Sequence, residues 1–218
     1  LIIPSFGFLI AGFALLVAHL GAMNPKIGNL VPVLSSPLLS IHVSVIMFSY
    51  ALAGFMVLNS LTTFLLYIFG KKNNIETLQA VIKKLRVLSD MLLYPCAFFL
   101  AAGIFIGAIW ANVSWGRYWG WDPKEVWALI TFLLAALPFH TKTLTWFRNI
   151  FFYNIYILLI FASILMTYFG VNYFLGGMHS YAGDAQMGKS ISIILIVIVC
   201  LIAVIALAYR KYRLIFKY

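Results

Sequence analysis

Long apolar stretches, separated by short polar or aromatic segments, dominate the hydrophobic pattern of this chain. A helix needs roughly 20 consecutive apolar residues to cross about 30 Å of hydrocarbon. Stretches of about this length occur six times, which predicts an all-α, polytopic transmembrane helical bundle with about six spans. The expected spans cover about residues 5–22, 37–69, 87–111, 124–140, 146–169 and 190–209.

The composition supports a membrane protein with little room for a soluble domain. Of 218 residues, 64% are apolar and 9% are charged, and the mean hydropathy is +1.04. These values lie far outside the range of water-soluble domains. We therefore expect residues 1–218 to form a single transmembrane unit. The chain opens at Leu1 inside an apolar run, without a start methionine or a basic leader, which favours a piece of a longer polypeptide.

The net charge of +10 indicates membrane topology rather than a nucleic-acid partner, because the basic residues stand at the ends of apolar runs. Residues 71–86 are the one polar stretch of helical length and are expected to form a cytoplasmic amphipathic linker helix touching anionic lipid. One side of the membrane would then hold 11 of the 15 basic residues: five in this stretch, two in the loop at 142–148 and four in the C-terminal tail. This bias predicts a cytoplasmic C-terminus, with residues 112–124 and 170–188 outside.

Residues 115–127, WGRYWGWDPKEVW, carry the strongest chemical signal in the chain. Trp and Tyr commonly form belts at the membrane surface, but four tryptophans in thirteen positions are denser than such a belt requires. If the segment is helical before Pro123, one face carries three aromatic rings followed by a carboxylate; these residues are Trp115, Tyr118, Trp119 and Asp122. With Trp121 beside it, this face predicts a platform for a large planar ligand.

Charged residues in the same segment suggest two roles. Arg117 and Lys124 could pair with carboxylates at the edge of a planar anionic ligand. Asp122, Pro123 and Glu125 form a natural helix start, because Asp caps the first N–H groups, Pro suits the first position and Glu favours the N-terminus. Asp122 therefore has a structural role that needs no ligand.

Two histidines fall on the same side of the membrane as this segment. His42 lies one or two turns into the second expected span, and His179 lies in the loop GGMHSYAGDA. Each alone is more often a hydrogen-bonded or solvated interfacial residue. Together with the aromatic segment they could bind the iron of a porphyrin from opposite faces, because neutral imidazole is a good iron ligand.

His140 stands in AALPFHTKT, near the cytoplasmic end of the fourth expected span. An ionisable residue in a span can mark a site or a pathway, and one near a helix end can also reach the interface. The sequence leaves both interpretations open. One histidine supplies one axial ligand, so an inner site needs a second ligand from elsewhere. His19, in the first span, is more simply a hydrogen-bonded packing residue.

The segment WGRYWGWDPKEVWALI resembles the tryptophan-rich WWD signature of the heme-handling proteins. Three further segments, PVLSSPLLSIHVSVIMFSYA, PFHTKT and TYFGVNYFLGGMHSYA, are similar to the corresponding segments of the CcsA (ResC) branch. All four occur in the right order, and the resemblance covers about residues 32–183.

This resemblance implies a component of the two-protein cytochrome c synthase of a bacterial inner membrane or its equivalent. That synthase moves heme b across the membrane and joins it to the CxxCH motif of apocytochrome c. It implies that His42 and His179 ligate iron at an outer site and His140 at an inner site. A CcsB (ResB)-like subunit, or a fused N-terminal half, would supply the second inner ligand. The chain has no evident catalytic acid, base or nucleophile for this lyase-type reaction. Its expected contribution is to hold heme with the vinyl edge accessible to thiols.

Two other functions stay open at this stage. A heme chaperone of the CcmC type shares the signature and presents heme to a carrier without making the thioether. The upstream PVLSSPLLSIHVSVIMFSYA and the form WDPKEVWALI favour the synthase branch. A b-type electron-transfer subunit usually places its histidine pairs within spans, so the loop position of His179 argues against that function.

Overall fold

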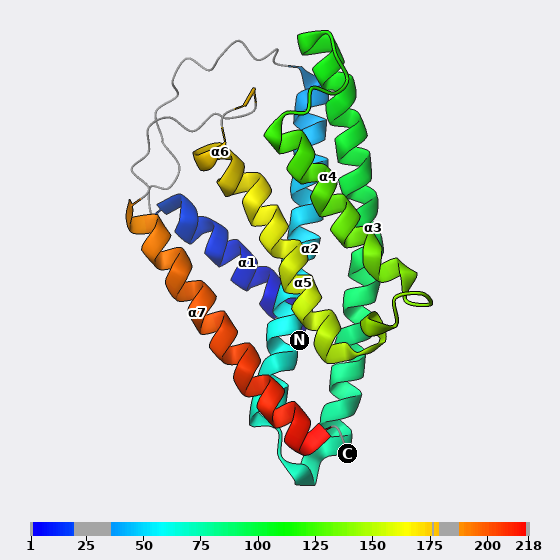
Figure 1. Ribbon diagram of the computed structural model, residues 1–218, viewed down its shortest axis with the longest axis vertical. Helices are drawn as coiled ribbons and strands as arrows, with labels where there is room; N and C mark the ends of the chain where they lie inside the picture. The colour runs from blue at the N-terminus through cyan, green and yellow to red at the C-terminus, as the bar shows by residue number, and fades with distance from the viewer. Residues whose placement is uncertain (1, 20–35, 176, 179–187, 217–218) are drawn as a thin grey trace.

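A computed structural model of the protein describes residues 2–19, 36–175, 177–178 and 188–216 and shows a bundle of helices (Figure 1). The α-helices are α1 Ile2–His19, α2 Pro37–Phe69, α3 Ile75–Trp115, α4 Pro123–Ala136, α5 Ile150–Leu165, α6 Val171–Phe174 and α7 Gly188–Lys211. Shorter helical turns are η1 Lys72–Asn74, η2 Leu137–His140, η3 Thr145–Arg148, η4 Met166–Gly170 and η5 Tyr212–Phe216. The described residues contain no strand, so the expected all-α fold is confirmed.

Four helical segments among the described residues are long and apolar enough to cross a membrane. These segments are Pro37–Phe69, Ile75–Trp115, Ile150–Phe174 and Ile194–Leu214. They correspond to the second, third, fifth and sixth expected spans. The other two expected spans are also helical: α1 covers 18 described residues, and α4 has 14 residues before η2 begins. The class of polytopic helical membrane protein is confirmed, with four of six spans supported by length and composition.

Helices α2 and α3 run antiparallel along the bundle and form its longest pair (Figure 1). Buried side chains from α2, α3 and α5 make one core, which includes Met56, Leu93, Leu100, Tyr153 and Ile160. Half of the most apolar part of the α5 segment is buried, compared with 6% for α7. Helix α5 is therefore central, whereas α7 exposes most of its apolar surface at the periphery.

The separate linker helix expected at residues 71–86 is not present, because residues 75–86 are the first turns of α3. Ile82, Leu85, Ser89 and Leu93 are all buried and continue one face of the helix across the expected boundary. No glycine or proline interrupts the chain there. At 1.5 Å per residue, α3 is about 60 Å long, roughly twice the thickness of the hydrocarbon layer. Its polar first turns therefore extend beyond the apolar span.

Arg86 connects this part of α3 to the beginning of α5. Its Nε donates to the carboxylate of Asp90 at 2.9 Å, one turn along the same helix. Its Nη1 donates to the carbonyl oxygen of Phe147 at 2.8 Å, and its guanidinium lies 3.4 Å from the ring centre of Tyr153. A partly buried cation is thereby paired on three sides, which orients α5 against α3.

Candidate functional site

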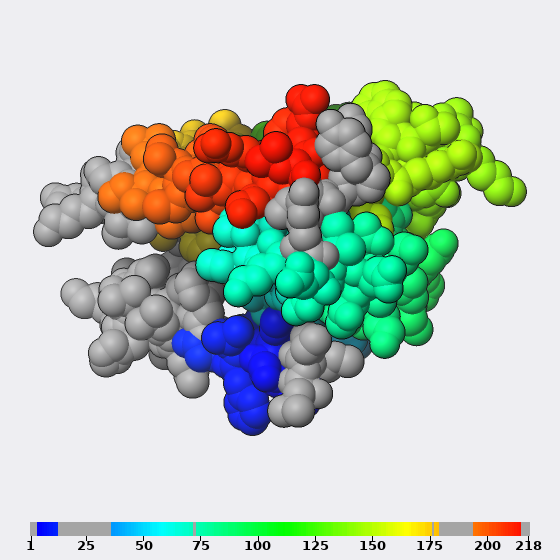
Figure 2. Space-filling view, turned by 90° about the horizontal axis from the view of Figure 1, so that it is seen from below, coloured from blue at the N-terminus to red at the C-terminus, as the bar shows by residue number. Residues whose placement is uncertain are grey.

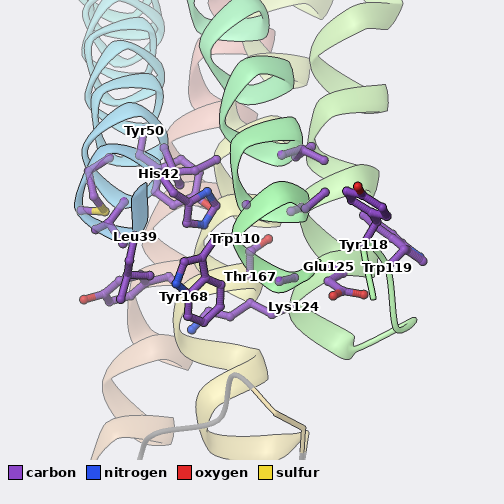
Figure 3. A pocket seen from close by; sticks show the side chains of 18 of the residues that line it. Leu39, His42, Tyr50, Trp110, Tyr118, Trp119, Lys124, Glu125, Thr167 and Tyr168 are labelled. Atoms are coloured by element: carbon purple, nitrogen blue, oxygen red, sulfur yellow. The ribbon is translucent and has the colours of Figure 1, made fainter. Parts of the chain in front are cut away.

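A cavity of about 370 Å³ lies between α2, α3, α4 and the η4–α6 segment, near the beginnings of α2 and α4 (Figure 3). This volume falls within the range of roughly 300–1,000 Å³ that is typical of cofactor sites. The aromatic lining consists of Tyr50, Trp110, Tyr118, Trp119 and Tyr168. The polar lining consists of His42, Lys124, Glu125, Thr167 and Asn172. Apolar walls with few polar groups suit a large planar ligand with an anionic edge.

His42 reaches the cavity from the second turn of α2. The helix begins where Ser36 accepts a hydrogen bond from the backbone N–H of Leu39, with Pro37 in the first turn. Nδ1 of His42 lies 2.8 Å from the carbonyl oxygen of Gly103. Because a carbonyl only accepts, Nδ1 carries the proton and the neutral ring has its lone pair on Nε2. Metal-binding histidines commonly have this arrangement.

Two glycines of α3 make room for α2 at this point. A Cβ atom on Gly107 would lie 2.6 Å from Cε1 and 2.8 Å from Nδ1 of His42, and a Cβ atom on Gly103 would collide with Ile46. Small residues four apart let membrane helices approach closely. Sequence reasoning missed both residues, although the GIFIG spacing of residues 103–107 was a visible signal.

Replacing Gly107 with alanine is expected to push the His42 ring out of its hydrogen bond with Gly103. Overpacking costs about 1–3 kcal/mol, so affinity for heme, the ligand predicted from the sequence, should fall about fivefold to 150-fold. Heme titration of the purified protein, followed by absorbance, measures the change. Gly54→Ala is the control, because a Cβ atom there meets Ile10 at an ordinary 3.6 Å. Equal affinity in the two variants would contradict the packing of His42 against Gly107.

The helical face expected for residues 115–122 is wrong, because α3 ends at Trp115 and α4 begins only at Pro123. Gly116 adopts a left-handed conformation with φ of 72°, and its N–H donates to the carbonyl of Asn112 at 2.9 Å. This arrangement terminates a helix. Trp121 also has positive φ, at 56°, which is uncommon for a residue with a side chain.

The loop separates the aromatic rings that a helix would have aligned. Tyr118 and Trp119 line the cavity and lie to one side of the view, away from His42 (Figure 3). Trp115 packs edge to face on Trp110, with ring centres 4.9 Å apart. The side chain of Trp121 is 73% exposed. Of the aromatic residues that were expected to form one platform, only Tyr118 and Trp119 therefore line the cavity together.

Three lining residues are additions that sequence reasoning did not single out. Trp110, on α3, is only 3% exposed and stands near His42 in the middle of the view (Figure 3). Tyr168 lies in η4 and Asn172 in α6. A tryptophan within an apolar span, one turn before the aromatic loop, was the available signal for Trp110. Tyr168 and Asn172 had none, because their place in the cavity depends on tertiary packing.

Asp122 and Glu125 start α4 as expected. The side chain of Asp122 accepts from the N–H of Lys124 at 3.2 Å, and Glu125 accepts from the N–H of Asp122 at 3.1 Å and of Gly120 at 2.8 Å. These bonds form a capping box, with Pro123 in the first turn of the helix. The loop is thereby joined firmly to the helix that follows.

The Asp122 carboxylate also joins this loop to the segment before His179. Its other oxygen accepts from the backbone N–H of Met178 at 2.6 Å, although Asp122 is only 7% exposed. A Cβ atom on Gly177 would collide with that carboxylate, so glycine is needed for this approach. Arg117, expected to meet a ligand, lies with Nη2 2.7 Å from the sulfur of Met178. His179 itself lies outside the described residues.

Lys124 brings positive charge to the cavity. It lies in the first turn of α4, is partly buried and donates from Nζ to the side-chain oxygen of Asn172 at 2.9 Å. The neighbouring carboxylate of Glu125 is engaged by the two backbone N–H groups of the cap. Lys124 is therefore the cation placed to attract an anionic group of a ligand.

His140 is not brought together with the other candidate residues. It ends η2, is exposed and does not line the cavity. It lies at the far end of the α4–η2 segment from Pro123, roughly 25–30 Å away at helical rise. The described residues contain no group of three or more His, Cys, Asp or Glu side chains that could hold a bare metal ion. An iron porphyrin needs only axial ligands from the protein.

Comparison with known proteins places this geometry in a biological context. A sequence model of the family described as cytochrome C assembly protein matches residues 2–179. Protein NrfI of Wolinella succinogenes is 46% identical over 182 residues, covering 83% of this chain and 20% of that protein. Cytochrome c biogenesis protein CcsA of Chlamydomonas reinhardtii is 39% identical over 155 residues, covering 70% and 42%. CcsA of Trachelium caeruleum is 34% identical over 199 residues, covering 75% and 62%. The chain spans less than two thirds of the length of each relative.

Proposed function

Because the chain belongs to the cytochrome C assembly protein family, we propose that it binds heme and holds it at the outer face of the membrane for covalent attachment to the CxxCH motif of apocytochrome c. One observation carries this proposal. His42 stands in an aromatic cavity with Nδ1 hydrogen-bonded to a backbone carbonyl, so its lone pair is on Nε2.

The residues around His42 fit heme in three respects. Nε2 of a neutral imidazole is a suitable axial ligand for iron. Tyr118 and Trp119 offer aromatic surface to a planar ring system. Lys124, in the same cavity, can pair with a propionate carboxylate. His179 is proposed as the second axial ligand. In support, the preceding residue, Met178, is bonded to Asp122 and Arg117, and the loop that carries them also supplies Tyr118 and Trp119 to the cavity.

The proposed contribution of the protein to the reaction is positioning. Bound heme supplies two vinyl groups, and each cysteine thiol adds across one of them. The S–H bond breaks and new C–S and C–H bonds form, so the addition needs no net oxidant or reductant. In this scheme His42 orients the ring system and Lys124 orients its carboxylate edge. Proximity of this kind can lower a barrier without a catalytic acid or base.

His140 is proposed to ligate iron at a second, inner site as heme b crosses the membrane. Its exposure and its distance from the cavity are compatible with a ligand set completed by another polypeptide. We infer a CcsB-like subunit, or a fused N-terminal half, as the source of the second inner ligand. We also propose that the protein lies in a bacterial inner membrane or its equivalent, with its C-terminus in the cytoplasm.

Coexpression tests this function. The chain, its CcsB-like partner and an apocytochrome with CxxCH are produced in cells that lack other maturation systems. Peroxidase staining of a denaturing gel should reveal covalent heme on the apocytochrome. Heme bound by the membrane proteins without any covalent product would instead indicate a chaperone of the CcmC type. Absence of bound heme from the complete assembly would overturn the proposal.

A further inference from the structure

A second cavity, of about 310 Å³, lies at the end of the bundle opposite the first. Here α2 and α7 end while α3 and α5 begin, and side chains from all four regions line the space. Figure 2 looks at this end and shows the last turns of α7 beside the connection between α2 and α3. The proposed heme site, on the other end, makes no use of this cavity.

The described lining of this cavity contains two cations and no carboxylate. Lys83 comes from the early turns of α3, and Arg148 comes from η3 just before α5; both are exposed. Nε of Arg148 donates to the carbonyl oxygen of Thr141 at 3.2 Å, which anchors the guanidinium by one edge. The amide side chains of Gln79 and Asn149 add neutral hydrogen-bonding groups. An anion with several acceptor oxygens matches this set.

The first turn of α5 adds to the positive potential. Asn149 caps this 16-residue helix by accepting from the N–H groups of Phe151 at 2.8 Å and Phe152 at 3.2 Å. Asn149, Ile150 and Phe151 all line the cavity. The positive end of the helix dipole therefore lies at the cavity together with the two cations.

The wall behind the cations is aromatic and apolar. Tyr67 and Phe151 are buried, and the ring of Tyr212 stacks on Phe151 at 5.1 Å and meets Tyr67 edge-on at 5.3 Å. Exposed apolar side chains continue from this wall along both helices that end here, including Phe69 and Leu207. In a membrane-spanning chain this apolar surface faces lipid tails, so the two cations beside it lie where the headgroup of an anionic lipid can reach them.

We propose that this cavity binds the headgroup of an anionic phospholipid. The phosphate diester interacts with Lys83 and Arg148, and the acyl chains lie along the exposed apolar side of α7. Because Lys83 belongs to α3, Arg148 precedes α5 and Tyr212 follows α7, one lipid contacts three parts of the bundle. It thereby holds α7, whose apolar part is only 6% buried by protein, against the other helices.

Thermal unfolding of the full chain in a neutral detergent tests the site. Phosphatidylglycerol, phosphatidylcholine and inorganic phosphate are titrated separately, and heme content is measured on the same samples. Phosphatidylglycerol should raise the midpoint, whereas the other two should not. In K83Q/R148Q the concentration giving half of this shift should rise at least about tenfold, because two charged contacts are lost. K84Q/K142Q removes two exposed cations that do not line the cavity and should behave as wild type.

Native mass spectrometry gives a second measurement that does not depend on stability. Wild type and K84Q/K142Q should retain phosphatidylglycerol on purification, and K83Q/R148Q should lose it; Lys83→Gln alone serves if the double variant does not fold. Equal lipid retention and an equal midpoint shift in K83Q/R148Q and wild type would overturn the proposal. A shift produced equally by inorganic phosphate would assign the cavity to a free anion instead. Since heme is measured separately, failure of the lipid site is distinguishable from failure of the proposed function.

Discussion

His42→Ala is expected to lower the heme retained on purification at least about tenfold, which corresponds to a loss of about 1.4 kcal/mol in binding. The variant removes the imidazole whose lone pair is directed by the bond from Nδ1 to Gly103. The absorption spectrum of any remaining heme should show altered axial ligation. Added imidazole should restore part of the heme content, because the small ring can occupy the space that alanine leaves.

Ser44→Ala is the matched control for this variant. Ser44 is exposed on the same helix, two residues further along, and its hydroxyl only donates to the carbonyl of Ser40. We expect wild-type heme content and a wild-type spectrum. An unchanged spectrum in His42→Ala would show that another residue ligates the iron and would remove the central support of the proposed function.

Asp122→Ala is expected to release two segments at once. It removes the cap of α4 and the acceptor for the N–H of Met178. Loss of a charge-assisted hydrogen bond costs about 1.5–3 kcal/mol, so amide exchange at Met178 should become about ten to 150 times faster. Hydrogen exchange with mass spectrometry measures it. Asp122→Asn keeps one carbonyl oxygen and should give an intermediate rate. Cytochrome maturation should fall in the same order.

A control for the loss of charge is Glu76→Gln, which removes an exposed carboxylate in the first turn of α3, at the opposite end of that helix from Trp115 and the loop that follows it. Its exchange at Met178 should match wild type. Slow exchange at Met178 in Asp122→Ala would mean that the carboxylate does not hold this segment. Maturation would then have to depend on Asp122 in another way, for example through the cap alone.

Features set by neighbouring residues could be predicted from the sequence. The start of α4 is one example, because Asp122, Pro123 and Glu125 interact within a single turn. The helical class is another, since long apolar stretches in a membrane leave few alternatives for the backbone. The place of His42 near the beginning of a span followed in the same way from the apolar run that contains it.

Features that depend on distant segments could not be predicted. The contact between Asp122 and Met178 joins residues 56 positions apart. The aromatic face was predicted wrongly because helical spacing was assumed through Gly116, whose left-handed conformation ends α3. The boundary placed after Arg86 was also wrong, because charge was taken to mark the end of a span, whereas buried Leu85 and Ser89 continue the helix. Burial on one face outweighs charge on the other in deciding where a helix ends.

The partner of the His42 ring is the main chain of α3, and this has a consequence for mutational robustness. In an α-helix the carbonyl of Gly103 also accepts from the N–H of Gly107, so one glycine supplies the acceptor while the other supplies the space for the ring. No side-chain substitution at either position can delete that oxygen. Variation there acts only through crowding, and the orientation of the imidazole is therefore tolerant of chemical change but sensitive to a single added methyl group.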